Sequence, residues 1–292
     1  MRPIQIIGAA SGWGAQDRGC ADGPDALRHA GLLARLHDTG LIAAWTDTLR
    51  PGVMNYATQA VSAMCTRLAQ SVYASVVSGH FPLVIGGDHS CAIGTWSGVH
   101  RAIGNVPFGL IWIDAHMDSH TPQTSPSGAL HGMPLACLLG HGVPALTGIG
   151  GRPPQLLPQH VCLIGVRSFE PGEAALLARL NVRVFDMAEI LRRGIDEVVA
   201  DALEIVQRDT AGFGVSIDLD ALDPREDPGV GSPVADGLLG CELLAGLRPL
   251  QQHPALLGLE LMEYNPHRDQ HQATAHMALD LAQALLESRQ LL

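Results

Sequence analysis

The chain has 292 residues, 47% of them hydrophobic, and it carries a net charge of −11 with an isoelectric point near 5.6. This length suits one large α/β domain or two small ones, with enough apolar residues for a substantial core. The acidic balance argues against a nucleic-acid partner, which needs a basic face, and gives no support for binding to an anionic membrane surface. No linker divides the chain, so we predict a single domain over residues 1–292.

The cysteines and the first residues indicate the compartment. Six cysteines are scattered without a CxxC pair, which indicates neither a disulfide framework nor a cysteine zinc site. The opening MRPIQIIGAASGWG lacks the long apolar segment of a signal peptide and is typical of a first strand and its loop. No apolar run is long enough to span a membrane. We therefore expect a reducing, cytoplasmic compartment.

Short apolar runs alternate with longer helical patterns along the chain. The predicted strands are, in chain order, residues 4–8, 83–86, 109–113, 161–165, 182–185, 214–217 and 256–259. The predicted helices are residues 57–77, 173–180, 195–207 and 273–286. This alternation requires crossover connections, and the strands are continuously apolar, as expected when both faces are covered. The pattern predicts an α/β fold, an open parallel sheet with helices on both faces.

Three of the predicted strands end in polar side chains that suit metal coordination. They are Asp88 and His89 in PLVIGGDHS, Asp114, His116 and Asp118 in GLIWIDAHMDSH, and Asp218 and Asp220 in GVSIDLDALDP. If strand geometry continues, residues two apart point to the same side. The carboxyl ends of parallel strands also meet at one edge of a sheet. We therefore expect these side chains to lie together, walled by the loops 119–130 and 223–236.

Each motif alone also fits turn chemistry. The DxHxD stretch could be a polar loop, Asp223-Pro224 indicates a turn, and Asp88 or Ser90 could cap a helix. Carboxylates brought together without a cation would repel one another, and their pKa values would rise. Divalent cations remove that cost, so the combination of motifs favours a metal centre.

The donor set narrows the choice of metal. Carboxylate oxygens with two imidazoles favour manganese, although Fe, Co, Ni or Zn could occupy the same ligands. There are too many donors for one tetrahedral zinc ion. Two metals about 3.5–4 Å apart with bridging carboxylates fit the count, and such a pair makes hydroxide from a bridging water.

At these residues the chain resembles the ureohydrolase (arginase/agmatinase) family. The family signatures G-G-D-H-S, D-A-H-x-D and S-x-D-x-D-x-x-D-P stand at 86–90, 114–118 and 216–224, in the family's order. The opening segment resembles arginases in particular. GVRSFEPGE at 165–173 and GLELMEYNP at 258–266 match later family segments, so the resemblance covers nearly the whole chain.

The resemblance implies an open α/β fold around two Mn²⁺ ions per subunit. One ion would take His89, Asp114, Asp118 and Asp218, and the other would take Asp114, His116, Asp218 and Asp220. Asp114 and Asp218 would then bridge the two ions. The implied activity is hydrolysis of L-arginine to L-ornithine and urea, by attack of the metal-bridging hydroxide on the guanidinium carbon.

Two further catalytic residues are implied, besides the ligand Asp118. Glu263 would hold the guanidinium by a charge-assisted hydrogen bond, and His131, in SGALHGMP, would carry a proton to the departing amine. Taken without the resemblance, Glu263 could be a solvated loop acid and His131 a histidine at a helix start. The family commonly forms trimers or hexamers, which implies a homotrimer or homohexamer here.

The substrate end departs from the arginase pattern. The resemblance assigns Ser127, Glu170, His120 and Ser232 to substrate binding. Arginases carry Asn where Ala129 and His120 stand, Asp where Glu170 stands, and Thr where Ser232 stands. The reacting half of the predicted site is therefore intact, and the half that reads the far end of the substrate is altered.

Other activities stay open at this stage. The chain could be another ureohydrolase, an agmatinase, guanidinobutyrase or formiminoglutamase, acting on a different small substrate. A related metal-dependent deacetylase has no use for a guanidinium-binding acid such as Glu263. A non-enzymatic binding protein would be expected to have lost some of the ligands, and none is lost.

Overall fold

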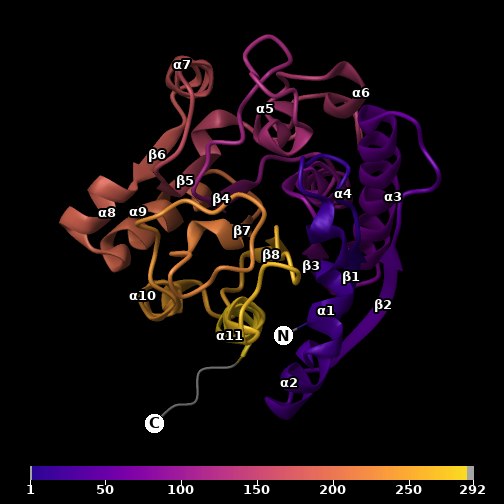
Figure 1. The fold of residues 1–292 in the computed structure, drawn as a ribbon, viewed down its shortest axis with the longest axis vertical. Coiled ribbons are helices and arrows are strands. Elements are labelled where there is room, and N and C mark those ends of the chain that lie inside the picture. The colour runs from indigo at the N-terminus through magenta and orange to yellow at the C-terminus, as the bar shows by residue number, and fades with distance from the viewer. Residues whose placement is uncertain (1, 288–292) are drawn as a thin grey trace.

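The computed structural model describes residues 2–287 and is built around an eight-stranded sheet (Figure 1). The strand order is β2-β1-β3-β8-β7-β4-β5-β6, and every adjacent pair is parallel. The strands are β1 (Ile4–Ala9), β2 (Ala43–Leu49), β3 (Phe81–Gly86), β4 (Gly109–Ile113), β5 (Val161–Val166), β6 (Arg183–Asp186), β7 (Phe213–Asp218) and β8 (Leu256–Met262). The predicted open parallel sheet is confirmed.

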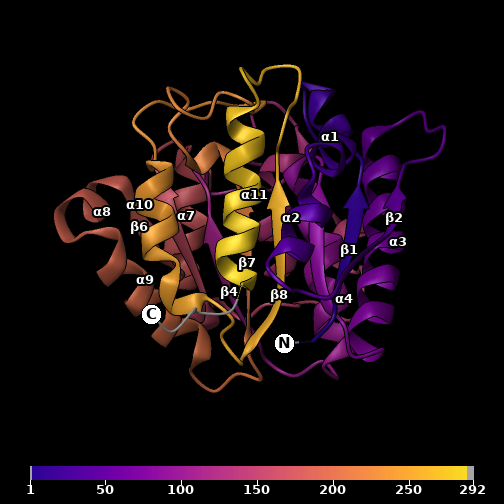
Figure 2. The same cartoon turned by 90° about the horizontal axis from the view of Figure 1, so that it is seen from below.

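Helices cover both faces of this sheet. One face packs against α1 (Gly23–His29), α2 (Leu32–Asp38), α8 (Met187–Arg193), α9 (Ile195–Gln207), α10 (Gly240–Gly246) and α11 (Ala273–Leu286). The other packs against α3 (Ala57–Val77), α4 (Ala92–Ala102), α5 (Pro134–Leu138) and α7 (Pro171–Leu180), and α6 (Pro144–Thr147) lies against α3. Short 3-10 turns are η1 (Arg18–Asp22), η2 (His89–Cys91), η3 (Leu130–Gly132), η4 (Pro158–His160), η5 (Leu219–Ala221) and η6 (Arg248–Leu250). Figure 2 shows α10, α11 and α1 in front of the strands.

The continuous apolar runs of the strands serve two cores. In β4, Ile111 and Ile113 join the core beneath α9 and α11, whereas Leu110 and Trp112 join the core beneath α3 and α4. Alternate strand residues point to opposite faces, so a strand covered on both faces needs apolar residues at every position. This packing explains why these strands show no polar alternation.

The predicted helices 57–77, 195–207 and 273–286 have the observed bounds. Helix α7 begins two residues before the predicted start, at Pro171, because proline suits the first turn of a helix. Strand β2 was not predicted. It is an edge strand in which only the first and last residues are buried, so its sequence AAWTDTL lacks the apolar run of a central strand.

The middle of the sheet sets the position of the site. Strands β3, β8, β7 and β4 are adjacent although they are far apart in sequence, and chain order reverses among them. In open parallel sheets, ligands bind beyond the carboxyl ends of the strands at such a reversal. Among the described residues, no helix is long and apolar enough to cross a membrane.

Candidate active site

The predicted ligands leave their strands by turns and not by continued strand geometry. Strand β4 ends just before Asp114, and Asp118 has a left-handed backbone with φ of 47°. The Asp114 carboxylate accepts the His116 N–H at 2.7 Å, and the Asp218 carboxylate accepts the Asp220 N–H at 2.8 Å. The expectation that alternation along an extended strand aligns these residues is therefore wrong. The same segments therefore both form turns and bring the candidate ligands together.

The first group of donors surrounds His89. Its Nδ1 lies 2.9 Å from Asp218 Oδ2, 3.2 Å from Asp114 Oδ2 and 3.3 Å from Asp118 Oδ2. All four side chains are buried, and Asp118 Oδ2 has no hydrogen-bond partner among the described residues. Buried oxygens without partners are costly, and a cation among these atoms would remove that cost. The group therefore fits a divalent metal.

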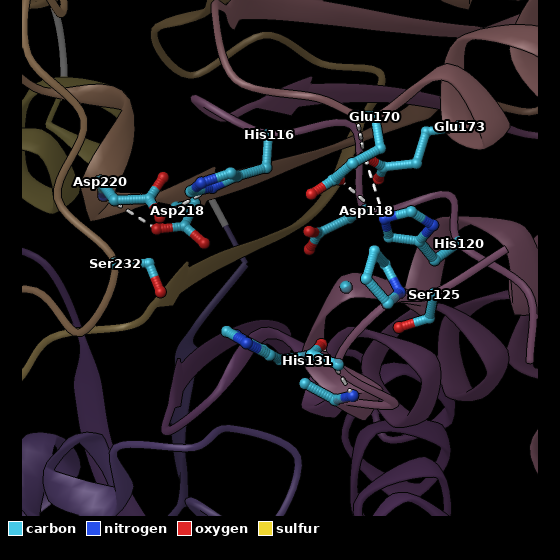
Figure 3. A pocket seen from close by; sticks show the side chains of 14 residues that line it. His116, Asp118, His120, Ser125, His131, Glu170, Glu173, Asp218, Asp220 and Ser232 are labelled. Carbon is cyan, nitrogen blue, oxygen red and sulfur yellow. Dashed lines mark hydrogen bonds and ion pairs between the residues drawn. The ribbon is translucent and has the colours of Figure 1, made fainter.

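The second group shares a carboxylate with the first. His116 Nδ1 lies 3.1 Å from Asp220 Oδ2 and 3.5 Å from Asp114 Oδ1, so the two oxygens of Asp114 face two different histidines. Figure 3 shows His116, Asp218 and Asp220 together on one side of the pocket. A carboxylate placed between two donor groups suits a pair of neighbouring ions.

Electrostatics indicate that this region is built to hold positive charge. Burial and the nearby Asp114 raise the pKa of Asp118 to about 6, and burial also raises the pKa values of Asp218 and Asp220. Burial alone would lower the pKa of His89, but the surrounding carboxylates raise it well above its usual value. Protons and metal ions would therefore compete for the same oxygens and nitrogens.

The ring of His89 is fixed on several sides. It stacks on Trp112, with ring centroids 4.1 Å apart, and the Trp112 indole N–H donates to Asp114 Oδ2 at 2.8 Å. On the far side of the ring, His89 Nε2 lies 2.9 Å from Ser216 Oγ. Asp88 plays the capping role considered from sequence, because its carboxylate accepts the Ser90 N–H at the start of η2.

The buried Glu263 and the partly buried His131 form a pair beside the two groups of candidate metal donors. Glu263 has a left-handed backbone with φ of 64°, and its Oε1 lies 3.0 Å from His131 Nδ1 and accepts the His89 backbone N–H at 2.8 Å. Burial alone would lower the pKa of His131, but the charge of Glu263 raises it to about 9. Glu263 is therefore no solvated loop acid, and His131 is not an isolated helix-start residue.

The residues predicted to bind the substrate line the same pocket, with His120 and Glu170 across it from His116, Asp218, Asp220 and Ser232. The pocket walls include His116, Asp118, His120, Ser125, Ser127, Ala129, His131, Glu170, Glu173, Asp218, Asp220 and Ser232. His120 Nε2 lies 2.8 Å from Glu170 Oε2 and 3.3 Å from Glu173 Oε2, and its Nδ1 lies 3.1 Å from Thr124 Oγ1. His120 is thus a wall residue clamped between carboxylates, and Figure 3 shows it beside Glu170.

Glu173 is a pocket residue that we did not single out from sequence. Its carboxylate accepts the backbone N–H groups of Glu170 and Ser119, which joins the start of α7 to the loop after β4. Burial raises its pKa to about 8. The available signal was the pair of glutamates three residues apart in GVRSFEPGE, the spacing of a capping box.

Comparison with known proteins identifies the family. The Arginase family model matches residues 2–287. Arginase from Bacillus caldovelox is 40% identical over 297 residues, which cover 98% of each chain. The solved structure of arginase from Bacillus subtilis is 37% identical, covers all of both chains and superposes with a TM-score of 0.93.

The chain belongs to the arginase family. A further solved structure, proclavaminate amidino hydrolase from Streptomyces clavuligerus, is 25% identical with a TM-score of 0.76, covering 97% of this chain and 90% of its own. The fold is therefore shared by proteins named for different substrates.

Proposed function

We infer that this chain hydrolyses L-arginine to L-ornithine and urea with two manganese ions per subunit. The observation that carries this inference is the shared carboxylate of Asp114, which faces His89 on one side and His116 on the other, next to a buried Glu263. The arginases of similar sequence match over nearly their whole length, which favours arginine among guanidino substrates.

The metal ions would be held by six side chains. We propose His89, Asp114, Asp118 and Asp218 for one ion, and Asp114, His116, Asp218 and Asp220 for the other. Hard oxygen donors with two imidazoles suit Mn²⁺. When bound, the ions supply the positive charge that acidifies water and makes a nucleophile available at neutral pH.

Glu263 would bind the reacting end of the substrate. Its carboxylate is buried next to His131, which lines the pocket, and it accepts the His89 backbone N–H. A guanidinium is planar and pairs well with a carboxylate, which would orient the reacting carbon toward the metal-binding side chains.

His131 would move the proton that the leaving amine needs. Its Nδ1 contacts Glu263, so Nε2 is the nitrogen free to exchange a proton with the substrate. Gly14 O accepts the backbone N–H groups of Leu130 and His131 and so fixes this turn against the first loop of the chain. A positioned general acid of this kind contributes about 10²–10⁴-fold to a rate.

The outer wall would hold the amino-acid end of arginine. Glu170 presents a half-exposed carboxylate for the α-ammonium group, with His120 holding that carboxylate in place, and the Ser127 hydroxyl offers a donor for the α-carboxylate. Ser232 completes the opposite wall of the same pocket. No lysine or arginine lines this pocket among the described residues, so the α-carboxylate would be bound by neutral donors such as Ser127.

We further propose a homotrimer or homohexamer in a reducing, cytoplasmic compartment, with neither nucleic acid nor membrane as a partner. The net charge of −11 and six free cysteines support the compartment and the lack of an anionic partner. Mass photometry would measure the oligomer directly.

A substrate panel tests the activity. Manganese-loaded protein would be incubated with arginine, agmatine, 4-guanidinobutyrate and formiminoglutamate, and urea or formamide would be measured. We expect urea mainly from arginine. Turnover mainly of another compound would reassign the substrate while leaving the metal centre, and absence of all products with two ions bound would contradict the proposal.

A further inference from the structure

An acidic residue lies in the middle of the sheet, outside the pocket. Glu260 is in the central strand β8, is fully buried, and lines no part of the candidate active site. A carboxyl group is costly to bury unless it is hydrogen-bonded. Its presence interrupted the apolar pattern of this strand, which is why the predicted strand stopped at residue 259 although β8 runs to Met262.

Two donors converge on one oxygen of this side chain. Glu260 Oε1 accepts the Trp96 indole N–H at 2.6 Å and the Ser216 hydroxyl at 2.6 Å. Ser216 pairs with Glu260 across β7 and β8, and Trp112 pairs with Ser216 across β4 and β7. These three residues therefore form one row across the sheet, directly beneath the ring of His89.

The fold makes room for the indole that holds Glu260. A Cβ atom on Gly214 would lie 2.0 Å from the Trp96 ring, so only glycine fits at this position of β7. Trp96 itself is fully buried in α4. Its N–H cannot accept a hydrogen bond, so the atom that faces it on residue 260 must be an acceptor.

This arrangement fixes the direction of the hydrogen bond to His89. The Ser216 hydroxyl has one proton, and that proton is donated to Glu260. Ser216 Oγ must then accept from His89 Nε2–H, 2.9 Å away. When the ring is neutral, as metal binding requires, its lone pair is therefore on Nδ1, which faces Asp114, Asp118 and Asp218.

We propose that Glu260 is a positioning residue that acts through Ser216 to hold His89 with Nδ1 directed at the metal ion. Partners behind a ligating histidine fix its tautomer and orientation in this way. Burial raises the pKa of Glu260, but the role needs only an acceptor at Oε1, which remains when a proton occupies the other oxygen. The proposal rests on the metal centre under the proposed function.

Two substitutions at one position test the proposal. Glu260→Met removes the acceptor with little change in size, and Glu260→Gln keeps it, because the Trp96 N–H holds the amide oxygen at the place of Oε1. Stepwise Mn²⁺ binding would be measured by competition with a metal-sensitive dye. We expect E260M to weaken the binding of one of the two ions by about 10- to 100-fold, and E260Q to stay within about 3-fold of the native protein.

Further measurements separate positioning from loss of folding. Ser216→Ala should weaken the binding of the same ion. The double variant S216A/E260M should lose no more affinity than either single variant, because both substitutions interrupt the same chain of hydrogen bonds from Glu260 through Ser216 to His89. Thermal unfolding of the metal-free proteins gives their stability. Val206→Ala in α9, a core residue on the opposite face of the sheet, serves as a control that is destabilised but should bind both ions normally.

The outcomes are distinct. Normal binding of both ions by E260M would contradict the proposed role of Glu260. Equal losses of affinity in E260Q and E260M, or additive losses in the double variant, would contradict it as well. If the native protein itself binds fewer than two ions, the proposed metal centre fails, whatever the variants do.

Discussion

The inner wall of the pocket (Asp118, Asp218 and Asp220) and its outer wall (His120, Glu170 and Glu173) are each built around a histidine held by carboxylates, but they hold it differently. His89 lies behind the inner wall, is fully buried, and is fixed by a stacked tryptophan, a serine and three aspartates. His120 on the outer wall lies in a loop, and the side chain of its nearest partner, Glu170, is 53% exposed. The inner wall is built on strand ends of a rigid sheet, which suits chemistry, and the outer wall can change with the substrate.

The largest effect is expected from the inner wall. Asp114→Asn would replace the carboxylate that faces both histidines with a neutral amide, so both ions should be lost or displaced. Bound metal ions stabilise the transition state by several kcal/mol, so their loss should lower kcat by about 10³-fold or more. Urea production and metal content by mass spectrometry would be measured together. Native activity with two bound ions would refute the shared role of Asp114.

A smaller loss is expected at His131. His131→Asn removes the proposed proton carrier and should lower kcat by about 10²-fold while two metal ions remain bound. Added imidazole should restore part of the rate. A variant that retains full activity would place proton transfer elsewhere.

The contact between His131 and Glu263 should also make the free energy of unfolding of the metal-free protein depend on pH. The pKa of His131 is raised from 6.5 to about 9, so its stabilisation is complete below about pH 6.5 and is lost as the pH rises to about 9. We expect a contribution on the order of 2 kcal/mol that disappears in His131→Asn. Urea unfolding at several pH values measures it. Identical pH dependence in both proteins would contradict the assignment.

At the outer wall, a change should affect substrate binding more than chemistry. His120→Ala removes the contact with Glu170 and Glu173 and should raise KM for arginine by about 10-fold, with kcat and metal content nearly unchanged. A fall in kcat with an unchanged KM would mean that His120 belongs functionally to the inner wall.

The smallest effect is expected at Ser232. Its hydroxyl lines the pocket, and the structure gives it no hydrogen bond to the metal-binding side chains. Ser232→Ala should change kcat/KM by less than about 5-fold, the value of one modest hydrogen bond. A loss near that of Asp114→Asn would give Ser232 a direct part in the reaction.

Sequence patterns predicted the central elements because burial leaves a local signature. Strand β4 and helices α3, α9 and α11 carry long apolar runs or periodic stripes, and their bounds agree with those predicted. The edge strand β2 and the end of β8 escaped detection, since partial exposure and the buried Glu260 break that signature.

Apolar runs in the sequence by themselves determined the parallel fold and placed the polar strand ends at one edge, where such ends must meet. The three signature motifs determined the resemblance to the family, and that resemblance implied the candidate ligands. Only the tertiary structure decided the rest. Asx turns, not strand alternation, aim Asp114 and Asp218, and the clamp on His120 by Glu170 and Glu173 joins two distant loops. Contacts between strands and loops far apart in the chain leave no periodic signal, so the support of each side chain appears only once the sheet is assembled.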